Sequence, residues 1–285
     1  MRYYRMGERL IATDGQGSWD LSAATAPIPD LVTLAEAAAL AGESIDHIAR
    51  RACSEETKLS LADPEARARR PIDPDEIWAA GVTYHISETA RTSESSLPDV
   101  YTGVYGADRP ELFFKATASR TVGPREAIGI RGDSDWNVPE PELGIVLYRD
   151  RIIGYTIGND VSSRAIEGEN PLYLPQAKIY DRSCAIGPCV VSAADIDDPQ
   201  DLHLSMRVQR DDQIIYEEST STAELVRTPN ELVSYYAAHN VLPRLSVLLT
   251  GTGLVPPDAF TLEPEDEVAI DIQEIGTLEN VVVTV

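Results

Sequence analysis

Short hydrophobic segments rich in β-branched residues recur along most of the chain, and Gly, Pro and Asp interrupt them. Many short segments of this kind, with few helical patterns between them, predict a domain built from sheets. One helix is predicted where Leu232, Val233 and Tyr236 recur at helical spacing. The predicted strands cover residues 77–82, 112–115, 127–130, 142–147, 152–159, 184–192, 202–209, 213–219 and 267–272, and the helix covers residues 229–238.

The first part of the chain has a different pattern. Residues 3–14 predict an opening hairpin with a turn at residues 14–17, and the alanine-rich residues 31–51 are typical of helix. Residues 63–71 are highly charged and contain Pro64 and Pro71, which is typical of a linker or a surface crossing. The predicted fold class is therefore α+β, mainly β, with a small N-terminal domain and linker over residues 1–70 and a main domain over residues 71–285.

Length and composition fit a soluble globular protein. With 285 residues, of which 43% are hydrophobic, the chain can fill a core. No apolar run approaches the roughly 20 residues that cross a bilayer, and the polar N-terminus does not resemble a signal peptide. We expect a cytoplasmic protein with no membrane partner. The three cysteines, Cys53, Cys184 and Cys189, indicate neither a disulfide framework nor a zinc site, and we expect them to be buried.

The charge balance is unusual, because 24 basic and 47 acidic residues give a formal net charge of −23. Such a surface repels nucleic acid and anionic membranes. Only three of the basic residues are lysines, namely Lys58, Lys115 and Lys178. At molar salt the Debye length is about 3 Å, so an acidic surface no longer repels itself strongly. These features lead to the hypothesis of a halophilic source.

Three carboxylates in two nearby segments predict a metal site. Glu140 and Glu142 are two apart in a predicted strand, so their side chains share one face, and Asp160 is expected on the neighbouring strand. Oxygen ligands favour Mg²⁺, with Mn²⁺ or Ca²⁺ also possible. In a chain with 47 acidic residues, the alternative is a solvated acidic edge.

Lysine is rare in this chain, and two of its three lysines lie near the three carboxylates in sequence. Lys115 and Lys178 flank the carboxylates in sequence. A lysine is a compact charge whose pKa falls on burial, so it serves as electrophile or base where arginine does not. The alternative is chance retention at the surface, where arginine serves equally well.

Four further segments accompany the Glu-x-Glu plus Asp triad, namely Gly81-Val82-Thr83-Tyr84, Arg109-Pro110-Glu111, Gln176-Ala177-Lys178-Ile179-Tyr180-Asp181 and Thr250-Gly251-Thr252. Together they resemble the fumarylacetoacetate hydrolase family. The resemblance extends from about Pro71 to the C-terminus, and it implies a mixed β-sandwich roll behind a small N-terminal domain, a divalent metal, and a homodimer or homotetramer.

One family motif is altered here. Family members that hydrolyse C–C bonds commonly carry Gly-x-Asn-Tyr-x-x-His-x-x-Glu, whose His and Glu activate water. This chain has Thr83, Ser87 and Ala90 at the Asn, His and Glu positions. Without that pair a hydrolytic water has no obvious base, whereas an elimination needs none. The segments at residues 78–84, 109–111, 133–136, 169–176 and 250–252 resemble the branch of the family that dehydrates 2-keto-3-deoxypentonates (xylonate or arabinonate) to 2,5-dioxopentanoate.

The chemistry of such an elimination assigns roles to individual residues. Lys178 is expected to stabilise the enolate formed at C2 and C3, and Glu111 to carry a proton from C3 to the departing C4 hydroxyl. For Glu111 the alternative is a structural ion pair with Arg109. A small-molecule 2-keto-3-deoxy sugar acid is the expected partner. Predicted substrate-binding residues are Thr83, Tyr84, Ser87, Lys115 and Thr252.

Three competing functions remain open at this point. An acylpyruvate-type hydrolase breaks a C–C bond, an oxaloacetate decarboxylase releases CO₂, and a dehydratase releases water. A non-catalytic acidic binding protein is a fourth possibility from a different class, and the intact triad with two retained lysines argues against it.

Overall fold

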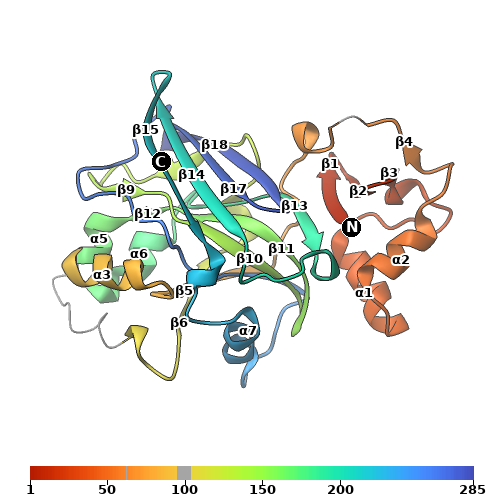
Figure 1. The fold of residues 1–285 in the computed structure, drawn as a ribbon, viewed down its shortest axis with the longest axis horizontal. Coiled ribbons are helices and arrows are strands. Elements are labelled where there is room, and N and C mark those ends of the chain that lie inside the picture. The colour runs from red at the N-terminus through yellow and green to blue at the C-terminus, as the bar shows by residue number, and fades with distance from the viewer. Residues whose placement is uncertain (62, 95–103) are drawn as a thin grey trace.

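The computed structural model describes residues 1–61, 63–94 and 104–285 (Figure 1). Within these residues the largest sheet has eleven strands in the order β4-β3-β2-β1-β13-β11-β10-β16-β5-β6, with β7 paired to β13. Its strands are β1 (Arg2–Met6), β2 (Arg9–Asp14), β3 (Gly17–Asp20), β4 (Lys58–Leu59), β5 (Glu76–Gly81), β6 (Glu111–Ala116), β7 (Thr121–Val122), β10 (Pro141–Tyr148), β11 (Arg151–Asp160), β13 (Cys184–Ser192) and β16 (Leu245–Leu249).

A second sheet packs against the first. Among the described residues it has five strands in the order β15-β14-β17-β18-β8, and the short strands β9 (Asn137–Val138) and β12 (Ser162–Ser163) form a separate pair. Leu143 and Ile157 of the large sheet share one buried core with Leu204, Val268 and Leu278 of the second sheet. The prediction of an α+β, mainly β fold is confirmed. The strands of the second sheet are β8 (Ile128–Ile130), β14 (His203–Arg210), β15 (Gln213–Ser221), β17 (Glu267–Ile272) and β18 (Gly276–Thr284).

Short helices cover both ends of the molecule in Figure 1, with α1 and α2 at one end and α3, α5 and α6 at the other. The helical pattern predicted over residues 31–51 is interrupted, because Gly42 adopts a left-handed φ of 68° and ends α1. The helices are α1 (Leu31–Ala41), α2 (Ile45–Ala52), α3 (His85–Glu94), α5 (Arg164–Glu169), α6 (Leu174–Lys178) and α7 (Pro229–Ala237). Single 3₁₀ turns are η1 (Leu21–Ala23), η2 (Glu65–Arg67), η3 (Ala118–Arg120), η4 (Pro171–Tyr173), η5 (Ala193–Asp195) and η6 (Thr222–Glu224).

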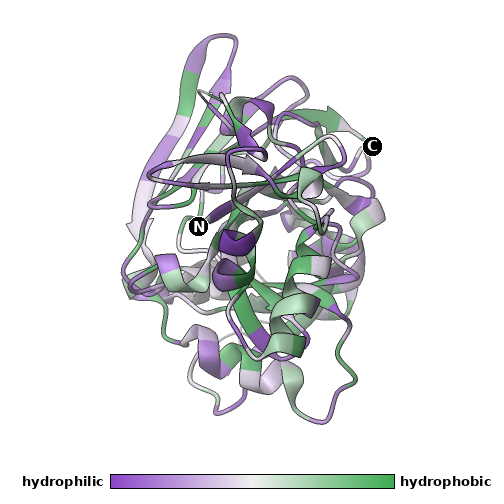
Figure 2. Ribbon diagram, turned by 90° about the vertical axis from the view of Figure 1, so that its right-hand side faces the viewer, coloured by the Kyte–Doolittle hydropathy of each residue, from purple (hydrophilic) through white to green (hydrophobic). Residues whose placement is uncertain are grey.

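The N-terminal strands continue the large sheet. Arg2 pairs with Val191 and Tyr3 with Val190, so β1 lies antiparallel to β13. A second buried core joins Leu34 of α1 to Val146 and Val247 of the large sheet. Figure 2 shows green hydrophobic and purple hydrophilic segments on the helices at this end, as expected for helices that pack one face on a sheet. The boundary near residue 70 stays a prediction.

No helix within the described ranges is both long and apolar enough to cross a membrane.

Candidate metal centre and active site

The three predicted carboxylates meet where β10 and β11 lie side by side. Antiparallel register places Glu142 opposite Gly158, and the Asp160 amide donates to the Glu140 carbonyl oxygen at 2.9 Å. Glu140 immediately precedes β10 rather than lying within it. One carboxylate oxygen from each residue lies within 4.8 Å of the other two, and all three residues are buried. The prediction that Asp160 lies on the neighbouring strand is confirmed.

Three buried cations surround this cluster. The Lys178 ammonium donates to Glu140 Oε2 at 2.9 Å and to Asp160 Oδ2 at 3.3 Å. Lys115 Nζ lies 2.5 Å from Asp160 Oδ1, and Arg164 Nη2 lies 3.0 Å from Glu140 Oε1. Glu140 and Asp160 are therefore each paired with two positive groups.

Glu142 has a different environment. Its Oε2 accepts from the Gly251 amide at 2.5 Å, but no cation lies within ion-pair distance of it among the described residues. Burial and the nearby Asp160 and Glu140 charges raise the pKa of Glu142 well above its usual range. A divalent cation at this point would supply the missing positive charge, and carboxylate oxygens are the ligands that Mg²⁺ prefers. The residues present therefore fit a magnesium ion.

The loop after β16 is held close to Glu142. Thr83 Oγ1 donates to the Thr250 carbonyl oxygen at 2.6 Å. Gly251 adopts a φ of +90°, and a Cβ there would lie 2.0 Å from Thr83 Oγ1 and 2.9 Å from the Ala80 carbonyl oxygen. Only glycine fits this position without displacing the loop, so the backbone donor to Glu142 depends on it.

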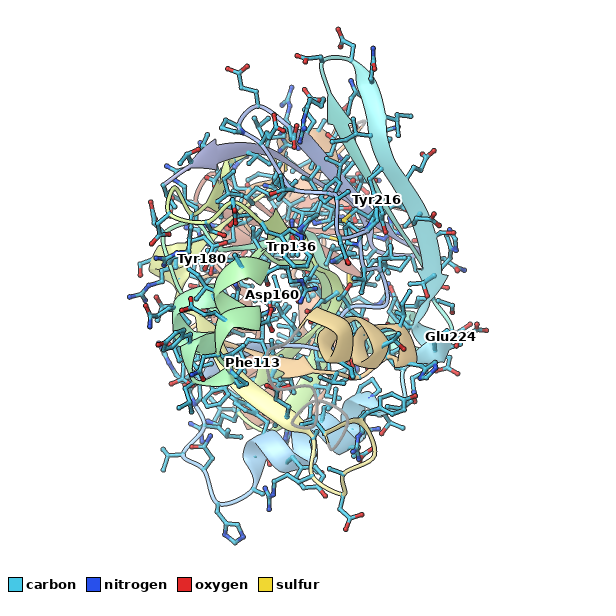
Figure 3. The ribbon with its side chains drawn as sticks, turned by 90° about the vertical axis from the view of Figure 1, so that its left-hand side faces the viewer. Phe113, Trp136, Asp160, Tyr180, Tyr216 and Glu224 are labelled. Carbon is cyan, nitrogen blue, oxygen red and sulfur yellow. The ribbon has the colours of Figure 1, made fainter. Side chains whose placement is uncertain are left out.

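A small, narrow cavity of about 20 Å³ opens in front of the cluster. Figure 3 shows Asp160 between α3 on one side and α5 and α6 on the other, with Phe113 below it. Three helices supply part of the wall, through Ser87, Glu167 and Leu174 respectively. The predicted site residues that line this cavity are Ser87, Glu111, Glu140, Glu142, Lys178 and Thr252.

Asp160, Thr83, Tyr84 and Lys115 are buried and are not among the residues that line this cavity. Lys115 donates to the carbonyl oxygens of Val161 at 2.9 Å and Lys178 at 2.6 Å, which ties β6 to the segment that carries Lys178. The buried Tyr84 hydroxyl has no hydrogen-bond partner in the described part of the chain, and burial raises its pKa. The substrate-binding roles of Thr83, Tyr84 and Lys115 stay predictions.

The remaining predicted residues have local partners. Ser87 Oγ donates to the Tyr84 carbonyl oxygen at 2.8 Å, and Thr252 Oγ1 donates to the Leu254 carbonyl oxygen at 3.1 Å. Glu111 packs directly against Gly81, where a Cβ would lie 2.1 Å from Glu111 Oε2. Arg109, the alternative partner of Glu111, stacks its guanidinium over the Tyr235 ring at 5.3 Å.

Sequence reasoning missed several residues of the site. Ser162 accepts from the Lys178 ammonium at 2.6 Å, and the Lys178 ammonium lies 5.5 Å from the centre of the Phe113 ring. Arg164 and Glu167 form an ion pair of 3.1 Å beside Glu140. Nearness in sequence to predicted site residues could have identified three of them, because Ser162 and Arg164 follow Asp160 by two and four residues and Phe113 precedes Lys115 by two.

Comparisons with known proteins agree with this geometry. Residues 77–283 match the model of the fumarylacetoacetate (FAA) hydrolase C-terminal family. The chain is 55% identical to a probable 2-keto-3-deoxyxylonate dehydratase of Haloferax volcanii, over 100% of this chain and 100% of that one. It is 43% identical to a 2-dehydro-3-deoxy-D-arabinonate dehydratase of Saccharolobus solfataricus, over 75% of this chain and 74% of that one.

A solved structure extends the likeness to three dimensions. It is a 2-keto-3-deoxy-D-arabinonate dehydratase complexed with magnesium and 2,5-dioxopentanoate, with a TM-score of 0.85 and 33% identity over 100% of this chain and 99% of that one. The family match covers well over half of the chain. The chain belongs to the fumarylacetoacetate hydrolase family.

Proposed function

We propose that this chain is a metal-dependent hydro-lyase that converts a 2-keto-3-deoxypentonate to 2,5-dioxopentanoate. The observation that carries the proposal is the likeness, over the whole chain, to a dehydratase structure that holds both magnesium and 2,5-dioxopentanoate. The two relatives above are also dehydratases of such sugar acids. The prediction of a dehydratase made from sequence is thereby confirmed.

Glu140, Glu142 and Asp160 would hold the metal, and Mg²⁺ is our first choice, with Mn²⁺ or Ca²⁺ as alternatives. When bound, such an ion supplies Lewis-acid polarisation of the C2 carbonyl of a 2-keto acid, which acidifies C3. The surrounding side chains keep the three carboxylates dry and fixed, since each is nearly fully buried.

Lys178 would stabilise the negative charge that develops on the C2 oxygen when C3 loses a proton. The Lys178 ammonium donates hydrogen bonds to Glu140, Asp160 and Ser162. Ser162 is the neutral partner of the three, so its hydrogen bond costs least to exchange for one to the substrate. Lys178 can therefore donate a hydrogen bond to the substrate while its hydrogen bonds to Glu140 and Asp160 stay in place.

Glu111 would carry the proton. It lines the same cavity as Lys178 and Glu142. A carboxylate there would take a proton from C3 and return it to the C4 hydroxyl, which leaves as water. The product of this step has a C3–C4 double bond. Transfer of a proton from C5 to C3 moves the double bond to C4–C5 and leaves an enol, and transfer of the C5 hydroxyl proton to C4 then gives the aldehyde of 2,5-dioxopentanoate. Water is the only molecule released.

The test is an assay of the purified protein in molar KCl with Mg²⁺. We expect 2-keto-3-deoxypentonate, supplied as each of its two C4 enantiomers, to yield 2,5-dioxopentanoate from at least one of them, read by a coupled aldehyde dehydrogenase, and we expect EDTA to abolish the reaction. Release of pyruvate or of CO₂ from family substrates, with no aldehyde from either enantiomer, would overturn the proposal in favour of the hydrolase or the decarboxylase. Catalysis that survives EDTA would contradict the proposal that the reaction depends on a metal.

The setting of the enzyme is also part of the proposal. The net charge of −23 supports the proposal that the enzyme functions in a cytoplasm with a high salt concentration. The family resemblance supports a homodimer or homotetramer, which light scattering in molar KCl measures directly.

A further inference from the structure

Arg164 is the bulkiest side chain that the described part of the chain buries almost completely, with 2% of its surface exposed. It opens α5, where Ser163 Oγ accepts from the Ile166 amide at 3.3 Å. The Arg164 amide donates to the Trp136 carbonyl oxygen at 2.8 Å. The backbone of Arg164 is therefore fixed on both sides, four residues after the predicted metal ligand Asp160.

The Arg164 guanidinium joins two carboxylates. Nη2 lies 3.0 Å from Glu140 Oε1, and Nη1 donates to Glu167 Oε2 at 3.1 Å. Glu140 thus has a cation on each oxygen, because Lys178 donates to its Oε2 at 2.9 Å. The contact from Nη2 to Glu140 is an ion pair and not a hydrogen bond, so Arg164 acts on the Glu140 carboxylate through its charge while Nη1 makes the hydrogen bond to Glu167.

Glu167 balances this arrangement. It is 5% exposed and lines the same cavity as Glu140 and Lys178. Lys115, Lys178 and Arg164 place three positive charges around the carboxylate cluster. Each additional uncompensated positive charge would repel a divalent cation in a medium of low dielectric. The negative charge of the Glu167 carboxylate compensates the positive charge of the Arg164 guanidinium.

Stability alone is a weak reason for such a pair. Burying an arginine and two carboxylates costs desolvation that their attraction barely repays, and well-packed apolar side chains often do as well. The position of the pair, in contact with a predicted metal ligand, is what distinguishes it from a structural ion pair.

We infer that Arg164 is a positioning residue for the metal ligand Glu140, and that Glu167 offsets the Arg164 charge beside the cation site. This inference rests on the metal site of the proposed function. Arg164 holds the carboxylate of Glu140 in one orientation, so that binding of the cation does not have to order it.

The test measures Mg²⁺ affinity by calorimetry, which requires no turnover. Residues that orient metal ligands typically contribute about 10- to 100-fold in affinity. We expect Arg164→Met to raise the Kd for Mg²⁺ by that factor, and Arg164→Lys to restore part of it. Glu167→Gln keeps the volume and an acceptor oxygen, and we expect a smaller rise of several-fold. Excess Mg²⁺ should return most of the kcat of Arg164→Lys.

The matched control is Arg210→Met. Arg210 also bridges two carboxylates, Glu263 at 2.6 Å and Asp266 at 2.7 Å, but it belongs to β14 of the other sheet. We expect this variant to melt at lower temperature with an unchanged Kd for Mg²⁺.

Each outcome decides the matter. Folded Arg164→Lys and Glu167→Gln proteins that bind Mg²⁺ as tightly as the wild type would overturn the inference alone. If no Arg164 variant folds, the Kd of Glu167→Gln decides it. Failure of the wild-type protein to bind Mg²⁺ would overturn the metal site and this inference together, whereas wild-type binding without dehydration would overturn only the proposed function.

Discussion

At the scale of single residues, the three carboxylates of the site differ in the groups that they contact. Glu140 and Asp160 each contact two cations, while Glu142 relies on one backbone amide. Spacing on a predicted strand pointed to Glu140 and Glu142, whereas the scarcity of lysines and the family resemblance pointed to Lys178. The sequence did not predict Arg164, because an arginine after a strand has no periodic signal and its partners come from tertiary packing.

The first prediction concerns Glu142→Gln. We expect Mg²⁺ binding to be lost and dehydration to fall at least about 100-fold, since one ligand oxygen supports several kcal/mol of charge stabilisation. The metal-free variant should melt no lower than the metal-free wild type, because glutamine removes an unpaired buried charge and can still accept from Gly251. Calorimetry, the coupled assay and thermal melts measure these effects. Glu217→Gln, at an exposed position of β15, is the control, and wild-type Mg²⁺ affinity in Glu142→Gln would contradict the ligand assignment.

The second prediction concerns the cysteines. Burial raises the pKa of Cys184 and Cys189 to about 12 and that of Cys53 to about 11. At pH 8 the thiolate fraction of each is very small, and the thiolate is the reactive form. We expect iodoacetamide at pH 8 to leave Cys184 and Cys189 unmodified in the folded protein, as mass spectrometry would show, and to modify them after unfolding. Rapid labelling of either one in the native state would contradict this.

At the scale of elements, the predicted strands and the observed ones largely coincide. The strand predictions at residues 184–192 and 267–272 match β13 and β17 in full, because β-branched runs between turn residues are a strong signal. The prediction missed β16, β18 and the short helices α3, α5 and α6. α5 and α6 have too few turns for a period to show, and α3, although ten residues long, carries few apolar residues to mark one.

The third prediction compares two glycines with left-handed φ. At Gly7, φ is +65° and a Cβ would meet nothing within 4 Å, so Gly7→Ala should cost about 1 kcal/mol and leave Mg²⁺ affinity unchanged. Gly251→Ala adds steric overlap with Thr83 and should cost about 3 kcal/mol or more, with weaker Mg²⁺ binding. Denaturant unfolding and calorimetry measure both. Equal losses of stability with equal Mg²⁺ affinity would show that the loop is not held as described.

At the scale of the whole molecule, charge is the main feature that packing does not explain. A net charge of −23 repels itself across the surface at low salt. The packed arrangement of two sheets could be predicted only through the family resemblance, because periodicity indicates strands and not their partners. The order of strands in the large sheet places β16 between β10 and β5, whose paired residues lie 97 to 105 and 170 positions earlier in the chain.

The fourth prediction is a strong dependence on salt. The Debye length rises from about 3 Å at 1 M to about 30 Å at 0.01 M, so repulsion returns as salt is removed. We expect the melting temperature to fall by more than about 10 °C, and activity to fall steeply, on dialysis from molar to millimolar KCl at constant Mg²⁺. NaCl should substitute for KCl if screening is the cause. A melting curve that does not change with salt would rule out this form of adaptation.

The pairing of β1 with β13 has a practical consequence. β13 lies between β1 and β11, and β11 carries Asp160 at its end. A shortened chain limited to residues 77–283, which the family model matches, would leave the backbone groups of Val190 and Val191 without their partners on β1. An interior strand would then become a hydrophobic edge, and exposed edges of that kind recruit other chains. We expect such a fragment to aggregate, so attempts to obtain a minimal enzyme should keep the first three strands.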